Sequence, residues 1–90
     1  MLIVMTYRVS KEGLQKAREF YPAHRARLDE FHASGKLLLA GPLADPSQGA
    51  LGIFTSKEAA EDFIAGDPFI TGGVVASWDL TEWGEVLSGH

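Results

Sequence analysis

The sequence predicts an α+β fold of the ferredoxin-like type, in which a four-stranded antiparallel sheet carries two helices on one face. The order of the patterns is the first observation, because extended and helical segments follow one another as βαββαβ. The size of the chain is the second: 90 residues, 46% of them hydrophobic, are enough for one small core. We therefore expect a single domain that spans residues 1–90.

The N-terminal third predicts a strand followed by a long helix. Residues 2–8 form an apolar and β-branched run that is typical of a strand. Ser10 is a suitable helix N-cap, and Gly35 stands where a left-handed residue would end the helix. Between them, apolar and aromatic side chains recur at steps of three and four residues, namely Leu14, Ala17, Tyr21, His24, Leu28 and Phe31.

Pro22 leaves two interpretations of this helix open. Proline lacks the backbone donor that a helix interior uses, and it disfavours the helical conformation of Tyr21 before it. Either one helix kinks at Pro22, or a short helix ends near Phe20 and a longer one begins with Pro22 in its first turn. The sequence does not distinguish the two.

Two further strands are expected in the middle of the chain. Residues 37–43 form an apolar run that Gly and Pro close, and residues 50–54 form a shorter one. The segment between them, residues 44–49, has the composition ADPSQG, which is typical of a loop.

The C-terminal part predicts a second helix and a final strand. Thr55 and Glu58 have the spacing of a capping box, so we expect a helix that begins there and ends at Gly66. A turn at residues 67–68 then leads into a last strand at residues 74–83.

The strands do not alternate cleanly between apolar and polar residues. Residues 2–7 and residues 37–39 are apolar on both sides of the expected sheet. A sheet with two apolar faces is covered on both, and the two helices can cover only one. We therefore expect a second copy of the chain to pack sheet to sheet against the first, which gives a homodimer.

Charge and composition exclude several classes of partner. The formal net charge is −4, whereas binding to nucleic acid requires a basic stripe. The apolar run at the N-terminus ends at Met5, which is too short for a signal peptide or a membrane span. The chain has no cysteine, so disulfides and thiolate chemistry are excluded. We expect a soluble cytoplasmic protein whose partners include neither nucleic acid nor membrane.

The histidines do not form a metal site. His24 and His32 are eight residues apart, about 12 Å along a helix, so they cannot share one ion. The chain also lacks the HExxH motif, the glycine and lysine spacing of a phosphate loop, and a nucleophile elbow. We expect no metal and no cofactor, an exposed position for His32, and a frayed position for His90.

His24 is the candidate for chemistry, because it falls on the apolar face of the predicted helix. An imidazole that is partly buried next to a carboxylate suits general acid–base catalysis near neutral pH. Asp67, at the turn after the second helix, is the candidate carboxylate. Two interpretations stay open: Asp67 reaches His24, or its side chain bonds the backbone of its own turn, as aspartate before proline commonly does.

Three segments resemble the YCII-related (YciI-like) family, and they occur in the family's order: PAHRARL at residues 22–28, GKLLLAGPL at residues 35–43, and GDPF at residues 66–69. The resemblance extends over essentially the whole chain, although the loop ADPSQG is short for the family, which would either widen the mouth of a pocket or alter the choice of substrate. It implies a dimeric α+β barrel of ferredoxin-like units and an active-site pair formed by His24 and Asp67. Most members of the family have no assigned reaction, but some eliminate chloride from chlorinated hydroxyquinols.

The resulting hypothesis is a small, cofactor-independent enzyme that moves protons on a compact oxygenated aromatic or enolic substrate, of lyase or isomerase type. His24 would be the general base, Asp67 would orient its imidazole, and loss of a group such as chloride would follow, as in a dehydrochlorinase. Tyr7 and Trp78 are expected to line the pocket and bind the substrate ring, with plain core packing as the alternative. The alternative function is a non-catalytic small-ligand binding or regulatory module in which His24 is structural.

Overall fold

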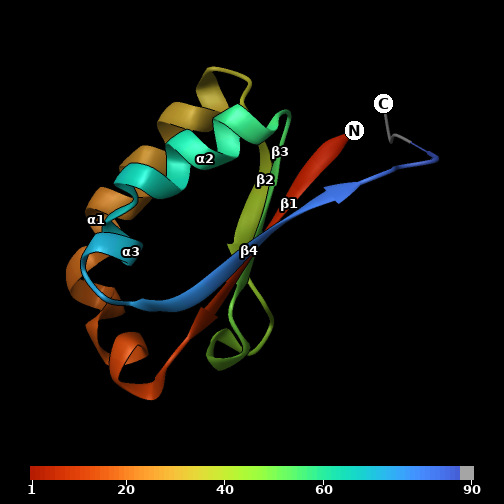
Figure 1. Cartoon of the computed structure of the whole chain (residues 1–90). Coiled ribbons are helices and arrows are strands. Elements are labelled where there is room, and N and C mark those ends of the chain that lie inside the picture. Colours follow the sequence, from red (N-terminus) through yellow and green to blue (C-terminus); the bar gives the residue numbers. More distant parts are fainter. Residues whose placement is uncertain (88–90) are drawn as a thin grey trace.

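The fold is a four-stranded antiparallel sheet with helices on one side. The computed structural model describes residues 1–87, so His90 lies outside the described residues. The strands pair in the order β2-β3-β1-β4, which confirms the predicted ferredoxin-like class. Figure 1 shows the helices together on one side of the sheet. The elements are β1 (Leu2–Val9), α1 (Lys11–Ala33), β2 (Leu37–Pro42), the 3-10 turn η1 (Pro46–Gln48), β3 (Ala50–Phe54), α2 (Lys57–Gly66), α3 (Pro68–Thr71) and β4 (Val75–Trp83).

The first helix, α1, is one continuous helix, so the interpretation with two separate helices is wrong. The Ser10 side chain caps it by accepting a hydrogen bond from the Gly13 N–H at 2.9 Å. Pro22 lies inside the helix, and Figure 1 shows that the helix axis curves along its length. Gly35, just beyond the C-cap, has the left-handed φ of 78° that lets the chain turn into β2.

Two local predictions differ from the structure. Ser56, and not Thr55, is the N-cap of α2, because the Ser56 hydroxyl accepts from the Ala59 N–H at 3.1 Å. The Thr55 N–H instead donates to the Lys36 carbonyl, which ties that residue to the chain just before β2. The turn predicted at residues 67–68 continues into the short helix α3, because a proline in the first turn favours helical geometry.

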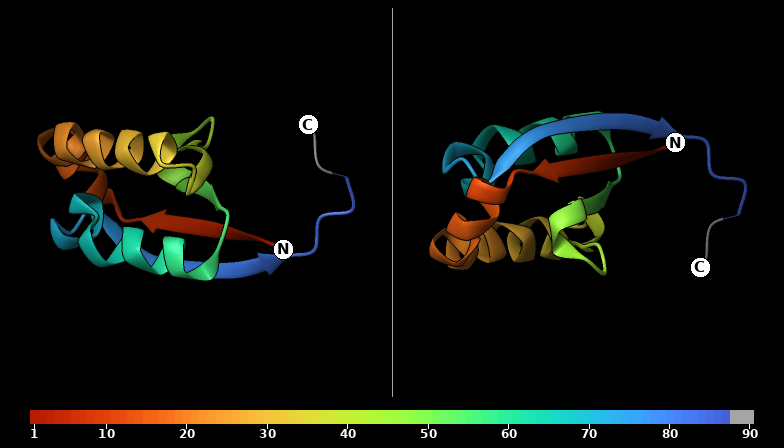
Figure 2. Two further views of the ribbon diagram at one scale, coloured as in Figure 1. Left: turned by 90° about the horizontal axis from the view of Figure 1, so that it is seen from above. Right: turned by 90° about the horizontal axis from the view of Figure 1, so that it is seen from below.

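The core lies between the helices and the sheet. Alternate residues of β1 (Ile3, Met5 and Tyr7) are buried on the face that the helices cover. Phe63 from α2 is fully buried, with its ring 5.2 Å from that of Phe31 on α1 and 5.4 Å from that of Phe54 on β3. Figure 2 shows α1 and α2 running alongside each other, with β1 seen between them. Aromatic packing therefore joins both long helices to the sheet.

The other face of the sheet carries no helix and is partly apolar, with the Arg8–Asp79 ion pair also on it. Val4 pairs with Ile53 on β3, and Leu2 pairs with Trp83 on β4, so these side chains share the face opposite to Ile3 and Met5. Trp83 is 49% exposed.

Removing the Phe63 ring should destabilise the fold strongly. We expect Phe63→Ala to lower the free energy of unfolding by about 3–5 kcal/mol, because it removes a fully buried aromatic ring and leaves a cavity. Urea denaturation followed by circular dichroism measures this change. Val86→Ala is the control and should cost less than about 0.5 kcal/mol, since Val86 is 94% exposed. Equal effects of the two substitutions would contradict this account of the core.

Candidate active site

Three elements of the fold bring His24, Asp67 and Tyr7 together. His24 lies on α1, Tyr7 on β1, and Asp67 is the residue between α2 and α3. The Nδ1 atom of His24 is 2.6 Å from Oδ1 of Asp67, and the Tyr7 hydroxyl donates to Oδ2 of Asp67 at 2.5 Å. Only 8% of His24 is exposed, and Asp67 is completely buried. Residues that are 43 and 60 positions apart in the sequence therefore form one hydrogen-bonded network.

Asp67 accepts hydrogen bonds at both carboxylate oxygens. Besides His24 and Tyr7, the backbone N–H of Phe69 donates to Oδ1 at 3.1 Å, which makes Asp67 the N-cap of α3. The two interpretations of Asp67 that the sequence left open therefore hold at the same time. A buried carboxylate with three donors is fully satisfied, as burial of a charged group requires.

Two contacts fix the imidazole of His24: a hydrogen bond in the plane of the ring and a stacked aromatic ring on its face. Its Nδ1 atom is engaged by Asp67, which only accepts, so Nδ1 carries the hydrogen. Its ring stacks on that of Phe69, with centroids 3.7 Å apart and planes 4° apart. Nε2 is therefore the nitrogen that remains for a ligand, and in the neutral ring it carries a lone pair.

Tyr7 was expected to bind a substrate ring, and the structure shows that its hydroxyl binds Asp67. Tyr7 is only 2% exposed. Burial of its phenol, together with the negative charge of Asp67 beside it, raises the pKa of Tyr7 well above its usual range. Tyr7 is therefore a hydrogen-bond donor throughout the neutral range. The sequence around Tyr7 gives no signal for the bond to Asp67, because Asp67 follows α2, 60 residues further along the chain.

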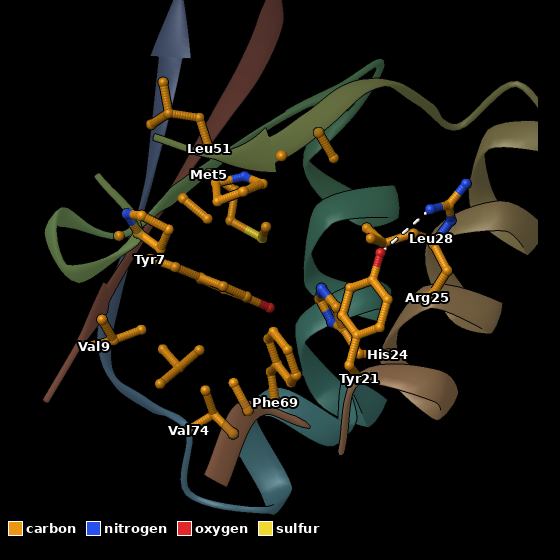
Figure 3. A pocket seen from close by; sticks show the side chains of 18 of the residues that line it. Met5, Tyr7, Val9, Tyr21, His24, Arg25, Leu28, Leu51, Phe69 and Val74 are labelled. Carbon is orange, nitrogen blue, oxygen red and sulfur yellow. Dashed lines mark hydrogen bonds between the residues drawn. The ribbon is translucent and has the colours of Figure 1, made fainter. Parts of the chain in front are cut away.

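A cavity of about 620 Å³ lies beside this network, and His24, Tyr7 and Phe69 all line it. Figure 3 shows the side chain of Tyr7 extending toward His24 and Phe69 across one end of the cavity. The volume is typical of a small-molecule site. The cavity exists because short residues face it from α1, β2, β3 and the loop before β3, namely Ala17, Ala40, Gly41, Gly49 and Ala50.

The rim of the cavity is exposed, which connects it to solvent. Leu39 is 70% exposed and Tyr21 is 46% exposed, and both line the cavity. Polar groups also lie at the rim: Nη1 of Arg25 donates to the Tyr21 hydroxyl at 3.2 Å (Figure 3), and Nε of Arg25 donates to Asp29 at 3.0 Å. A small molecule can therefore reach His24, with polar groups available near the entrance.

Trp78 and His32 are not part of the network formed by His24, Asp67 and Tyr7. Trp78 was expected to line the pocket, but it does not; it lies opposite Tyr7 on the edge strand β4 and is 42% exposed. His32 is exposed, as expected, and lines the far part of the cavity, where its Nδ1 atom is 2.8 Å from the Leu37 carbonyl. Within residues 1–87, no group of three or more histidine, aspartate or glutamate side chains could hold a metal ion.

Across residues 1–87, no helix combines the length and the apolar character that crossing a bilayer demands.

Known proteins resemble this chain in sequence. The family model described as the YCII-related domain matches residues 1–84. The proteins YciI of Escherichia coli O6:H1 and of Shigella flexneri are each 37% identical to it over 87 residues, which covers 82% of this chain and 87% of theirs.

Solved structures resemble the fold. The structure of 5-chloro-2-hydroxyhydroquinone dehydrochlorinase (TftG) from Burkholderia phenoliruptrix AC1100, in complex with 2,5-dihydroxybenzoquinone, superimposes with a TM-score of 0.76. Its sequence is 26% identical, and the match covers 92% of this chain and 93% of that one. An antibiotic biosynthesis monooxygenase has a TM-score of 0.55 at 11% identity, with coverage of 94% and 100%, and shares the fold alone.

Removing the Tyr7 hydroxyl should destabilise the protein. Tyr7→Phe leaves Oδ2 of Asp67 buried without its donor, so we expect the free energy of unfolding to fall by about 1–3 kcal/mol. Chemical denaturation at pH 7 measures this loss. Tyr21→Phe is a matched control, since Tyr21 is nearly half exposed. An unchanged stability of Tyr7→Phe would contradict the importance of this bond.

The stabilities of wild type and Tyr7→Phe should respond differently to alkaline pH. The pKa of Tyr7 is raised in the folded state relative to about 10 in the unfolded state, so its stabilising contribution is present below pH 10 and is lost as the pH rises above that value. The stability difference between wild type and Tyr7→Phe should therefore narrow above pH 10. A constant difference between pH 7 and pH 11 would argue against the raised pKa.

Proposed function

Because the chain belongs to the YCII-related domain family, we propose that it is a small cytoplasmic enzyme that uses His24 and Asp67 to move protons on an oxygenated aromatic or enolic substrate. One observation carries this proposal: the 2.6 Å bond between His24 and Asp67 lies at the wall of a cavity that reaches solvent. A histidine with only a structural role would be sealed from solvent and would not line such a cavity.

His24 is the general base in this proposal. Its Nε2 atom accepts a proton from a substrate hydroxyl, and the charge that forms on the imidazolium is stabilised by Asp67 2.6 Å away. Because Asp67 is completely buried, little water screens this attraction. Tyr7 and the Phe69 N–H hold the carboxylate, so Asp67 is already oriented before the substrate enters.

The similarity to a dehydrochlorinase supports loss of chloride as the reaction. For 5-chloro-2-hydroxyhydroquinone the atoms balance as hydroxybenzoquinone plus HCl. His24 takes the proton of the hydroxyl next to the chlorinated carbon and returns it to that carbon, so that this C–OH becomes C=O. The hydroxyl across the ring then loses its proton to solvent and becomes the second C=O. The electron pair that shifts through the ring leaves with chloride.

The mostly apolar lining suits such a ring. The cavity that His24 lines also presents Met5, Leu28 and Val74, which can contact apolar carbon and chlorine, while Arg25 at the rim can bind an oxygen.

A homodimer completes the proposal. The sheet face formed by Val4, Ile53, Leu2 and Trp83 carries no helix, and a second copy packed sheet to sheet would remove these side chains from water. An isologous contact of this kind is the commonest arrangement for a symmetric dimer.

Loss of either member of the pair should abolish most turnover. His24→Ala and Asp67→Asn should each lower kcat for chloride release from 5-chloro-2-hydroxyhydroquinone by about 10²–10⁴-fold, because the first removes the base and the second favours the wrong tautomer. Chloride release and quinone absorbance measure the rate. Arg18→Ala serves as a control on the same helix, because Arg18 is exposed and does not line the cavity. Full activity of His24→Ala would contradict the mechanism, and binding of 2,5-dihydroxybenzoquinone by wild type without any turnover would favour a binding module.

The dimer should dissociate when a charge is placed on the open sheet face. Sedimentation at micromolar concentration should show a dimer for wild type and a monomer for Ile53→Lys, because the lysine would be desolvated in a sheet-to-sheet contact. Lys57→Ala, on the helix side, is the control. A wild-type protein that sediments as a monomer would overturn the proposal.

A further inference from the structure

Arg27 links α1 to the C-terminal end of α2. Its Nε donates to the Phe63 carbonyl at 3.1 Å, and its Nη2 donates to the Asp62 carbonyl at 2.6 Å. Carbonyls near the end of a helix carry the negative end of its dipole, and α2 has no basic residue of its own in its last turn. Arg27 therefore supplies the positive charge that this helix end lacks.

The guanidinium lies against two aromatic rings that pack together. Its Cζ atom lies 4.9 Å from the centre of the Phe31 ring and 5.6 Å from the centre of the Phe63 ring. A planar guanidinium can stack on rings and donate two directed hydrogen bonds at once, which lysine cannot do.

Gly66 leaves the space that Arg27 fills. A Cβ atom at residue 66 would lie 2.9 Å from both Cζ and Nη2 of Arg27, closer than such atoms approach. Gly66 is the last residue of α2, and Asp67 follows it directly. Arg27 is therefore packed against the residue that precedes the buried carboxylate.

His24 and Arg27 together attach α1 to the segment around Asp67 at two points. They are three residues apart, so they lie one turn apart on the same side of the helix. His24 binds Asp67 itself, whereas Arg27 binds the end of the helix that leads to it. The contacts of His24 hold α1 against Asp67 and α3, and the Arg27 bonds add a separate attachment to the end of α2, which restrains α2 relative to α1.

We propose that Arg27 is a positioning residue, which holds the end of α2 so that Asp67 meets His24 in the geometry that proton transfer requires. The proposal rests on the function proposed above. Arg27 does not line the cavity, so it acts through Asp67 and not on the substrate. Displacements of about 1 Å in a catalytic group can cost on the order of 100-fold in rate.

The kinetic test compares Arg27→Met and Arg27→Lys with Arg18→Met. Arg18 is exposed on the same helix and does not line the cavity, so it is a matched control. With 5-chloro-2-hydroxyhydroquinone as substrate, kcat of Arg27→Met should fall about 10- to 100-fold while KM stays within about twofold, since substrate contacts are unchanged. Arg27→Lys, which keeps the charge and one bond, should restore part of the rate. A rise in KM with kcat unchanged would overturn the proposal.

A second measurement does not depend on turnover. The Nδ1–H proton of His24 should give a downfield NMR signal in wild type and Arg18→Met, and His24→Ala assigns it by its loss. In Arg27→Met this signal should shift or broaden at a temperature where circular dichroism shows a folded protein. An unchanged signal in a folded Arg27→Met would mean that Arg27 contributes stability only, which overturns the proposal.

The two measurements also separate this proposal from the proposed function. If wild type has no activity on the chlorinated substrate while Arg27→Met still changes the His24 signal, the positioning role stands and the proposed reaction fails. If Arg27→Met does not fold, Gly66→Ala replaces it, because its methyl group would push the guanidinium away from the α2 carbonyls. The same shift of the His24 signal is then expected, and its absence in folded Gly66→Ala overturns the proposal.

Discussion

Burial of the Asp67 carboxylate is the constraint on which the rest of the site depends. A carboxylate without solvent exposure is tolerated only when donors replace the water that it has lost, and its three donors come from three places: Tyr7 on β1, His24 on α1, and the first turn of α3. The network therefore joins the sheet, through β1, to the helices α1 and α3. The groups proposed to carry out the chemistry are also groups that hold the elements together, so the site is rigid because the fold is.

The sequence predicted most of the fold because its signals are local. The order βαββαβ, the cap at Ser10 and the stop at Gly35 each depend on a few neighbouring residues. The sequence was less reliable where two local solutions have similar energy. Ser56 and Thr55 are both good N-caps. Ser56 is the N-cap in the structure because the Thr55 N–H is bonded to the Lys36 carbonyl, just before β2.

The candidate site was only partly predictable for the same reason. Helical spacing places His24 on the apolar face, but its contact with Asp67 joins elements 43 residues apart, and the resemblance to a family suggested that pair. The roles of Tyr7 and Arg27 could not be found in the sequence. An aromatic residue in a strand usually means core packing, and an arginine on a helix usually means a solvated face. The sequence also did not predict which glycines lie too close to other backbone for a side chain. Gly13 is one of them, because a Cβ there would lie 2.2 Å from the Val74 carbonyl oxygen.

The stacking of His24 on Phe69 has a consequence for how a proton can travel. Rotation of the imidazole about its Cβ–Cγ bond would drive its edge into a ring 3.7 Å away and would break the bond to Asp67. The side chain therefore cannot turn over to pass a proton from one side of the protein to another. A proton that Nε2 accepts must then leave through the cavity from which it came, either to the bound molecule or to the water that replaces it. The base proposed here would therefore suit compounds in which the atom that gives up hydrogen and the atom that receives it are neighbours.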